Sequence, residues 1–258
     1  MIWVLVVAAI MAALAMVGFW RAVRCEAGWR AWICYPVARC HACVFARWRA
    51  ENSCTIPEFG PAIIVANHTS PADPPLLWIR HFAGFQRPRL RVIGFLMARE
   101  FMGRGIVAWV CRAMESIPVG RAGRDMAPMR AALRRLQAGH LLGVFPEGRL
   151  NKLSPDEQLL PGGTGVAWLA IKSGAPVIPV FIRNAPRHES LVRAFLMRTR
   201  TSLRYGQPVD LSRWTAGKLD QQQLAEATDA IMQAIARLGD IRYSPTTATH
   251  EPQQPTTA

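Results

Sequence analysis

The chain has 258 residues, of which 51% are hydrophobic, and it carries a formal net charge of +14 at pH 7. This length fits one catalytic-sized domain with a short appendage and leaves little room for several domains. The excess of basic residues calls for an anionic partner, either nucleic acid or an anionic lipid surface.

The first twenty residues contain no charged residue and no proline. A helix of this length spans about 30 Å, the hydrocarbon thickness of a bilayer. We therefore expect residues 1–20 to form a transmembrane anchor; a cleaved signal peptide is the alternative, because the "ALA" at residues 13–15 suits a signal peptidase. Between residues 21 and 49, six arginines against one acid, Glu26, predict a cytoplasmic location for everything after the anchor.

Residues 21–55 are expected to form a basic, Trp-rich helical segment at the membrane interface. Tryptophans and arginines alternate between residues 29 and 50, and both side chains suit the headgroup layer. An ordinary amphipathic core helix is the alternative. Cysteines at positions 34, 40, 43 and 54, with His41 among them, raise the possibility of a zinc site, but no second ligand pair follows. We expect reduced thiols that pack as small hydrophobic side chains.

Residues 56–240 are predicted to form one α/β domain, because short apolar runs alternate with amphipathic segments. Strands are expected at residues 62–67, 90–96, 141–145, 177–182 and 201–209. Helices are expected near residues 74–83, 126–139, 162–174 and 218–238. This order favours a largely parallel central sheet flanked by helices. Residues 241–258 lack apolar periodicity and are expected to form a disordered tail.

His68 and Asp73 follow the first buried strand in the stretch "NHTSPADP". A neutral imidazole accepts a proton near pH 7, and a carboxylate on its other ring nitrogen fixes the tautomer and stabilises the imidazolium. In the alternative reading Asp73 caps the next helix, with Pro74 at the first helical position, and His68 is a turn residue. The spacing alone leaves both readings open.

A second candidate stretch, "FPEGR", follows the strand at residues 141–145. In a parallel sheet its loop emerges at the same edge as His68. A tight turn at Gly148 would present Glu147, to accept hydrogen bonds from hydroxyls or to steady an arginine, and Arg149, to bind a phosphate. Arg121 in "SIPVGR" is a further candidate phosphate ligand, with a solvated arginine as the alternative.

The order of these blocks, His-x4-Asp, then Gly-Arg, then FPEG, then "VIPV" at residues 177–180, resembles the glycerolipid acyltransferase family, which includes 1-acylglycerol-3-phosphate acyltransferase. The resemblance covers about residues 60 to 185. It implies that His68 is the catalytic base and Asp73 its orienting partner. It also implies that Arg121, Glu147 and Gly148 bind the acceptor, and that Pro179 lies on the apolar side of the site.

The implied reaction transfers a fatty acyl group from an acyl thioester, carried by coenzyme A or acyl carrier protein, to a lysophospholipid hydroxyl. Lysophosphatidic acid is the first expected acceptor, which would yield phosphatidic acid. Gly120 and Arg149 replace residues common in the family, so lyso-ornithine lipid, another lysolipid and glycerol 3-phosphate remain alternatives. The resemblance implies no metal or cofactor, and a location at the cytoplasmic side of a bacterial inner membrane. A non-catalytic membrane adaptor is the alternative from another functional class.

Overall fold

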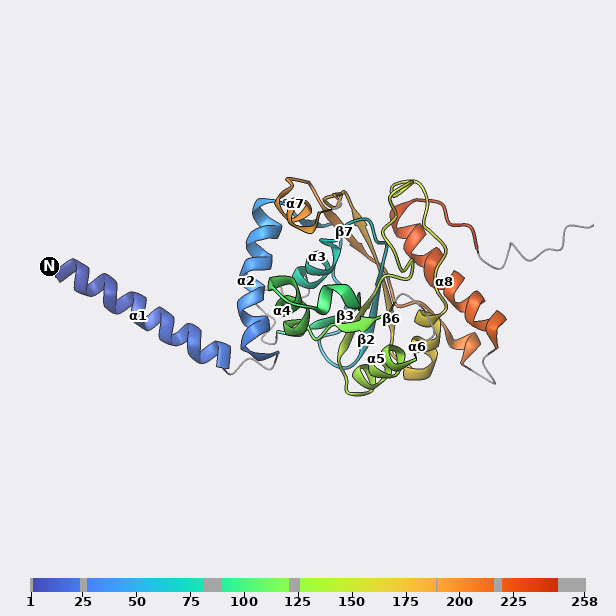
Figure 1. Ribbon diagram of the computed structural model, residues 1–258. Coiled ribbons are helices and arrows are strands. Elements are labelled where there is room, and N and C mark those ends of the chain that lie inside the picture. The colour runs from blue at the N-terminus through green and yellow to red at the C-terminus, as the bar shows by residue number, and fades with distance from the viewer. Residues whose placement is uncertain are drawn as a thin grey trace, which may run out of the picture.

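The computed structural model describes residues 2–23, 27–80, 90–120, 126–188, 190–215 and 220–245. Figure 1 shows a body built around one central sheet, with α1 (Ile2–Val23) leading into α2 (Gly28–Val44) on one side of it. The C-terminal helix, α8 (Gln221–Gly239), lies on the opposite side of the body.

The sheet has seven strands in the order β1-β7-β6-β2-β5-β3-β4, and every neighbouring pair is parallel except β6 and β7. The strands are β1 (Arg49–Ala50), β2 (Ala62–Ala66), β3 (Ile93–Ala98), β4 (Ile117–Val119), β5 (Leu141–Val144), β6 (Val177–Arg183) and β7 (Ser202–Tyr205). The mostly parallel α/β fold predicted from the sequence is confirmed.

The central strand β2 is buried along its whole length, which explains its unbroken apolar sequence. Its side chains alternate between the two faces of the sheet. Ile64 belongs to a hydrophobic cluster with Leu76, Leu77 and Trp78 of α3. Ile63 belongs to a second cluster on the other face. The sheet is therefore the middle of three layers.

Helices α5, α6 and α8 supply the second cluster, and α2 and α3 pack on the opposite face. The remaining helices are α3 (Asp73–Arg80), α4 (Ile106–Ala113), α5 (Ala127–Gln137), α6 (Gly165–Ser173) and α7 (Leu191–Leu196), with single 3₁₀ turns at Arg99–Met102 and Ser212–Trp214. Gly174 ends α6 in the left-handed conformation, at φ 65°, as its position in the sequence predicts.

The predicted transmembrane anchor is not found. Residues 2–23 do form a helix, but within the part of the chain that the structure describes no helix combines the length and apolar character needed to cross a membrane.

The fold also reaches further along the chain than expected. Arg242 exchanges backbone hydrogen bonds with Glu157 and Leu159, and the hydroxyl of Tyr243 donates to Asp229. Residues 241–245, assigned from the sequence to a disordered tail, are therefore held against the body. Residues 246–258 lie outside the described residues.

Candidate active site

Three loops meet where the neighbouring strands β6, β2 and β5 end. Because these strands are parallel, their carboxyl ends share one edge of the sheet. His68 follows β2, Glu147 follows β5, and residues 184–190 follow β6. This edge is where an α/β sheet places its functional residues.

The side chains of His68 and Asp73 are brought together. Nδ1 of His68 lies 3.0 Å from Oδ2 of Asp73, and the same oxygen accepts hydrogen bonds from the amides of Thr69 at 2.9 Å and Ser70 at 2.8 Å. Asp73 is fully buried, whereas the His68 side chain is 20% exposed. A carboxylate only accepts hydrogen bonds, so Nδ1 is the donor and Nε2 is left as the basic nitrogen.

Asp73 is also the first residue of α3. Its carboxylate therefore lies at the N-terminal end of this helix, where the helix dipole is positive. Oδ2 accepts from the amides of the preceding loop, and this contact points the carboxylate back towards His68. The two readings of the sequence are therefore compatible, since one residue both begins the helix and orients the imidazole.

A stack of aromatic rings fixes the other face of His68. The imidazole lies 4.1 Å from the Phe145 ring at an interplanar angle of 14°, and Phe145 stacks in turn on Phe95 at 5.6 Å. Phe95 packs over Gly143 of β5, where a Cβ atom would overlap its ring. The absence of a side chain at Gly143 therefore leaves room for the Phe95 ring in this stack.

Glu147 is buried, and its two oxygens hold two loops together. Oε1 accepts the amide of His68 at 2.8 Å, and Oε2 accepts the amide of Leu160 at 2.9 Å. Burial raises the pKa of Glu147, and the two amides oppose that shift. Both oxygens bind backbone amides, and the expected role of Glu147 as a ligand of the acceptor stays a prediction. Glu147 positions the loop that carries His68.

Gly148 and Arg149 lie at the exposed turn after Glu147. Gly148 has φ 66°, a conformation that favours glycine, and its amide donates to Phe145 at 3.0 Å. Arg149 is exposed directly after this turn. Two residues further on, the amide of Asn151 donates to the carbonyl of His68 at 2.7 Å. The turn is therefore tied to the His68 loop, as the sequence predicted.

Pro179, another predicted site residue, is not brought to this edge. Pro179 is paired with Val65 inside the sheet, accepts the amide of Gly206 through its carbonyl, and packs near Leu238 of α8. It supports the core, not the loop edge. Arg121 lies outside the described residues.

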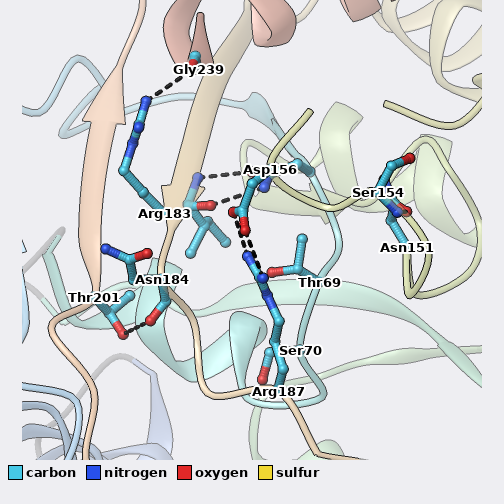
Figure 2. Close-up of polar contacts among 12 residues, drawn as sticks. Thr69, Ser70, Asn151, Ser154, Asp156, Arg183, Asn184, Arg187, Thr201 and Gly239 are labelled. Atoms are coloured by element: carbon cyan, nitrogen blue, oxygen red, sulfur yellow. Dashed lines mark hydrogen bonds and ion pairs between the residues drawn. The ribbon is translucent and has the colours of Figure 1, made fainter. Parts of the chain in front are cut away.

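A network of polar contacts that no sequence motif indicates joins the three loops (Figure 2). The side-chain amide of Asn67 exchanges hydrogen bonds of 2.8 and 2.9 Å with the backbone of Ile182. The hydroxyl of Ser70 donates to the carbonyl of Pro186 at 2.5 Å. These contacts attach the His68 loop to the segment after β6.

Arg187 and Asp156 form the third part of this network. The guanidinium donates two hydrogen bonds to the carboxylate, at 2.8 and 2.5 Å (Figure 2). Arg187 lowers the pKa of Asp156, and Asp156 raises the pKa of Arg187. A bidentate pair of this kind is more specific in geometry than a single contact. Neither residue belongs to a recognisable motif, so the sequence carried no signal for it.

A cavity of about 230 Å³ lies at the opposite edge of the sheet, where β2, β3 and β5 begin, and Arg91 and Arg135 are among its lining residues. Arg91 donates to the carbonyls of Pro57, Gly60 and Gly139. The guanidinium thus joins three turns, and this cavity is separate from His68.

The cysteine segment contributes no ligand cluster to either edge. Cys34 is buried, Cys40 and Cys43 are exposed, and Cys54 is half-buried. In the described ranges, no three His, Cys, Asp or Glu side chains are grouped so that they could hold a metal ion.

Comparisons with known proteins agree on one family. The acyltransferase family model matches residues 47–183, more than half of the chain. The N-acylphosphatidylethanolamine synthase of Arabidopsis thaliana is 29% identical over 125 residues, which cover 47% of this chain and only 42% of that protein. The crystal structure of the 1-acyl-sn-glycerophosphate (LPA) acyltransferase PlsC from Thermotoga maritima has a TM-score of 0.62 at 22% identity, covering 90% of each chain.

Proposed function

The chain belongs to the acyltransferase family, and on that basis we propose that it transfers a fatty acyl group from an acyl thioester to the hydroxyl of a membrane lysophospholipid. The first acceptor we propose is 1-acylglycerol 3-phosphate, which would give phosphatidic acid. The similarity in fold to the Thermotoga enzyme supports this acceptor. Family membership identifies the chain as an enzyme, so the adaptor alternative is set aside.

The observation that carries the proposal is the contact between His68 and Asp73. With Nδ1 bound to Asp73, Nε2 of His68 takes the proton from the acceptor hydroxyl. The oxygen attacks the thioester carbonyl carbon, the carbon–sulfur bond breaks, and the thiolate leaves with the proton from the imidazolium. Asp73 stabilises that imidazolium, as in other His–carboxylate pairs. We propose no metal and no covalent acyl-enzyme, because the thioester already supplies a good leaving group.

The acceptor's anionic group is proposed to lie against basic side chains at the same edge. Arg149 is exposed directly after the turn at Gly148, and this turn is tied to the His68 loop by the hydrogen bond from Asn151 to His68. Guanidinium groups bind phosphate in a fixed geometry. Arg121 remains a proposed ligand on the strength of its motif alone.

We propose that the enzyme works at the cytoplasmic face of a bacterial inner membrane. The exposed side chains of α2 include the large apolar residues Trp29, Ile33, Val37 and Val44 together with Arg30, while small residues such as Ala31 and Ala38 face the core. A helix with its larger apolar side chains on the outside suits the interface of a bilayer. This location would bring the site to an acceptor that does not leave the membrane.

The test is acyl transfer from labelled acyl-CoA, and from acyl carrier protein, to a panel of acceptors. The panel holds lysophosphatidic acid, lyso-ornithine lipid, glycerol 3-phosphate and phosphatidylethanolamine; the last is included because the Arabidopsis relative is named for N-acylation of that lipid. His68→Ala is compared with His140→Ala, an exposed histidine at the opposite edge of the sheet. Transfer to lysophosphatidic acid that is lost only in His68→Ala supports the proposal. Transfer that survives His68→Ala contradicts the assigned base, and transfer only to another member of the panel replaces the acceptor.

A further inference from the structure

The short helix α7 carries apolar side chains on its outer surface. Val192 is 66% exposed, Leu196 is 58% exposed, and Met197 directly after the helix is 36% exposed. Ala194 is the residue that α7 buries. Phe195 packs inward, but Val192 and Leu196 are large apolar side chains that point away from the body, which is the reverse of an ordinary surface helix. This arrangement marks α7 as part of an interaction surface.

Arginines surround these apolar positions. Residues 190–200 contain Arg193, Arg198 and Arg200 and no acidic residue, and all three arginines are exposed. Arginine has an apolar stem and a charged end, so it suits the layer where lipid chains meet anionic headgroups. The charge of this surface therefore complements an anionic bilayer.

The same surface continues from α2. The ring of Phe195 in α7 stacks on His41 of α2 with centroids 3.7 Å apart, and the amide of Thr199 donates to the carbonyl of Phe45 at 2.9 Å. Figure 1 shows α7 beside the end of α2 that is remote from α1. The exposed side chain of Val44, at the end of α2, thus belongs to the part of α2 that α7 contacts.

This position is also close to the candidate active site in the chain. The Ser70 hydroxyl, two residues after His68, donates to the carbonyl of Pro186, and α7 begins at Leu191. α7 therefore follows in sequence the segment that contacts the His68 loop.

We propose that α7, through Val192, Leu196 and the neighbouring arginines, is a further contact with an anionic lipid bilayer and brings the bilayer surface to the His68 site. The proposal rests on the proposed membrane location of the acceptor. A second copy of the chain is the competing occupant, but the net charge of +14 opposes association of two identical basic surfaces.

The first experiment is hydrogen–deuterium exchange of the full chain with and without vesicles. The vesicles are phosphatidylcholine mixed with phosphatidylglycerol, compared with phosphatidylcholine alone. We expect slower exchange of the α7 amides on the anionic vesicles and unchanged exchange in α5, which lies on the opposite face and serves as the internal control. Equal exchange of α7 in both states overturns the proposal. Protection of α7 that rises with protein concentration in the absence of vesicles also overturns it, in favour of a second copy.

The second experiment tests function with matched variants. Val192→Ser/Leu196→Ser and Arg193→Gln/Arg198→Gln alter α7, and Arg130→Gln/Arg134→Gln removes two exposed arginines from α5 as the control. Each basic residue near an anionic surface is worth roughly fivefold in binding, so the α7 arginine variant should bind the anionic vesicles at least about tenfold more weakly than the control. Two independent α7 variants guard against a folding defect in one.

Transfer to a short-chain lysophosphatidic acid dissolved as a monomer separates this inference from the proposed reaction. We expect the α7 variants to keep that transfer while losing transfer to lysophosphatidic acid in vesicles. If the α5 control and the α7 variants all lose transfer to both the monomeric and the vesicle-bound acceptor, α7 has no specific role. If no protein transfers to either acceptor but α7 is protected by anionic vesicles, the proposed reaction fails and the membrane contact of α7 stands.

Discussion

Nδ1 of His68 lies 3.0 Å from Oδ2 of Asp73, and Asp73 is completely buried beside an imidazole that is one-fifth exposed. The carboxylate is therefore shielded from water, while the opposite side of the ring remains accessible. This asymmetry suits a base that receives a proton from a substrate and is held by the protein on its other nitrogen.

Asp73→Asn should lower kcat by about 10²- to 10⁴-fold, because a neutral amide does not stabilise the imidazolium as a carboxylate does. The variant keeps the size of the side chain, and an amide oxygen facing the loop can still accept from Ser70. We expect the double variant with His68→Ala to be no less active than His68→Ala alone, since the two residues act as one unit. Steady-state transfer assays check both points, and near-normal activity in Asp73→Asn would rule out the pair as the catalytic unit.

Glu147→Gln should reduce both stability and transfer without removing a group that touches substrate. An amide side chain has one acceptor oxygen, so one of the two amide donors, from His68 or Leu160, would meet another donor. We expect a loss of about 2 kcal/mol in the free energy of unfolding and at least a tenfold lower kcat. Denaturant unfolding and kinetics on the same protein measure the two effects. Unchanged kcat would instead mean that the His68 loop is held adequately by its other contacts.

Gly143→Ala should disturb His68 from a distance. The added methyl group overlaps the Phe95 ring, which stacks on Phe145, which in turn stacks on the imidazole. Overpacking of this kind costs about 1–3 kcal/mol, and we expect a lower kcat at the same time. Gly163→Ala is the matched control, because its Cβ would meet only an ordinary contact of 3.7 Å with the carbonyl of Pro146. Equal losses of stability and kcat in the two variants would show that the aromatic stack is not the cause.

His41 should make the contact between α2 and α7 sensitive to acid. Burial lowers the pKa of His41 below its ordinary value of 6.5, so the folded protein favours the neutral ring. The contribution of His41 to stability is thus complete above about pH 6.5 and falls as the pH drops below that value, where the unfolded chain takes up the proton. His41→Phe keeps the stack on Phe195 and should flatten this part of the profile. Thermal unfolding across the pH range tests this, with His140→Phe as the exposed control.

The parts of the fold predicted well are those that local pattern determines. The apolar run at residues 62–67 predicted β2. The pairing of His68 with Asp73 was implied by the resemblance of the motifs, whereas the spacing alone left a helix-capping role open. Helix α6 ends where Gly174 requires it. By contrast, α7 is only six residues long, too short for periodicity to reveal it.

The rest of the site depends on contacts between distant segments. A carboxylate such as that of Glu147 is a common substrate ligand. Only its hydrogen-bond partners, 79 and 13 positions away in the sequence, show that it binds backbone amides. The pair of Arg187 and Asp156 joins residues 31 positions apart that belong to no motif. Pro179 matched its motif and lies in a predicted strand, but its pairing with Val65 depends on sheet register, which local sequence does not specify.

The hydrogen bonds between Asn67 and Ile182 have a consequence for biosynthesis. They join positions 115 residues apart, immediately before His68 and at the end of β6. A ribosome-bound chain that has emerged only as far as Glu147 contains the imidazole, its carboxylate partner and the residue that positions them, but not the strand that anchors them. Because domains assemble as units during synthesis, we expect the pair of His68 and Asp73 to acquire its geometry only after β6 has docked. A nascent chain that lacks β6 is therefore expected to lack the arrangement proposed for proton transfer, although both residues have already been translated.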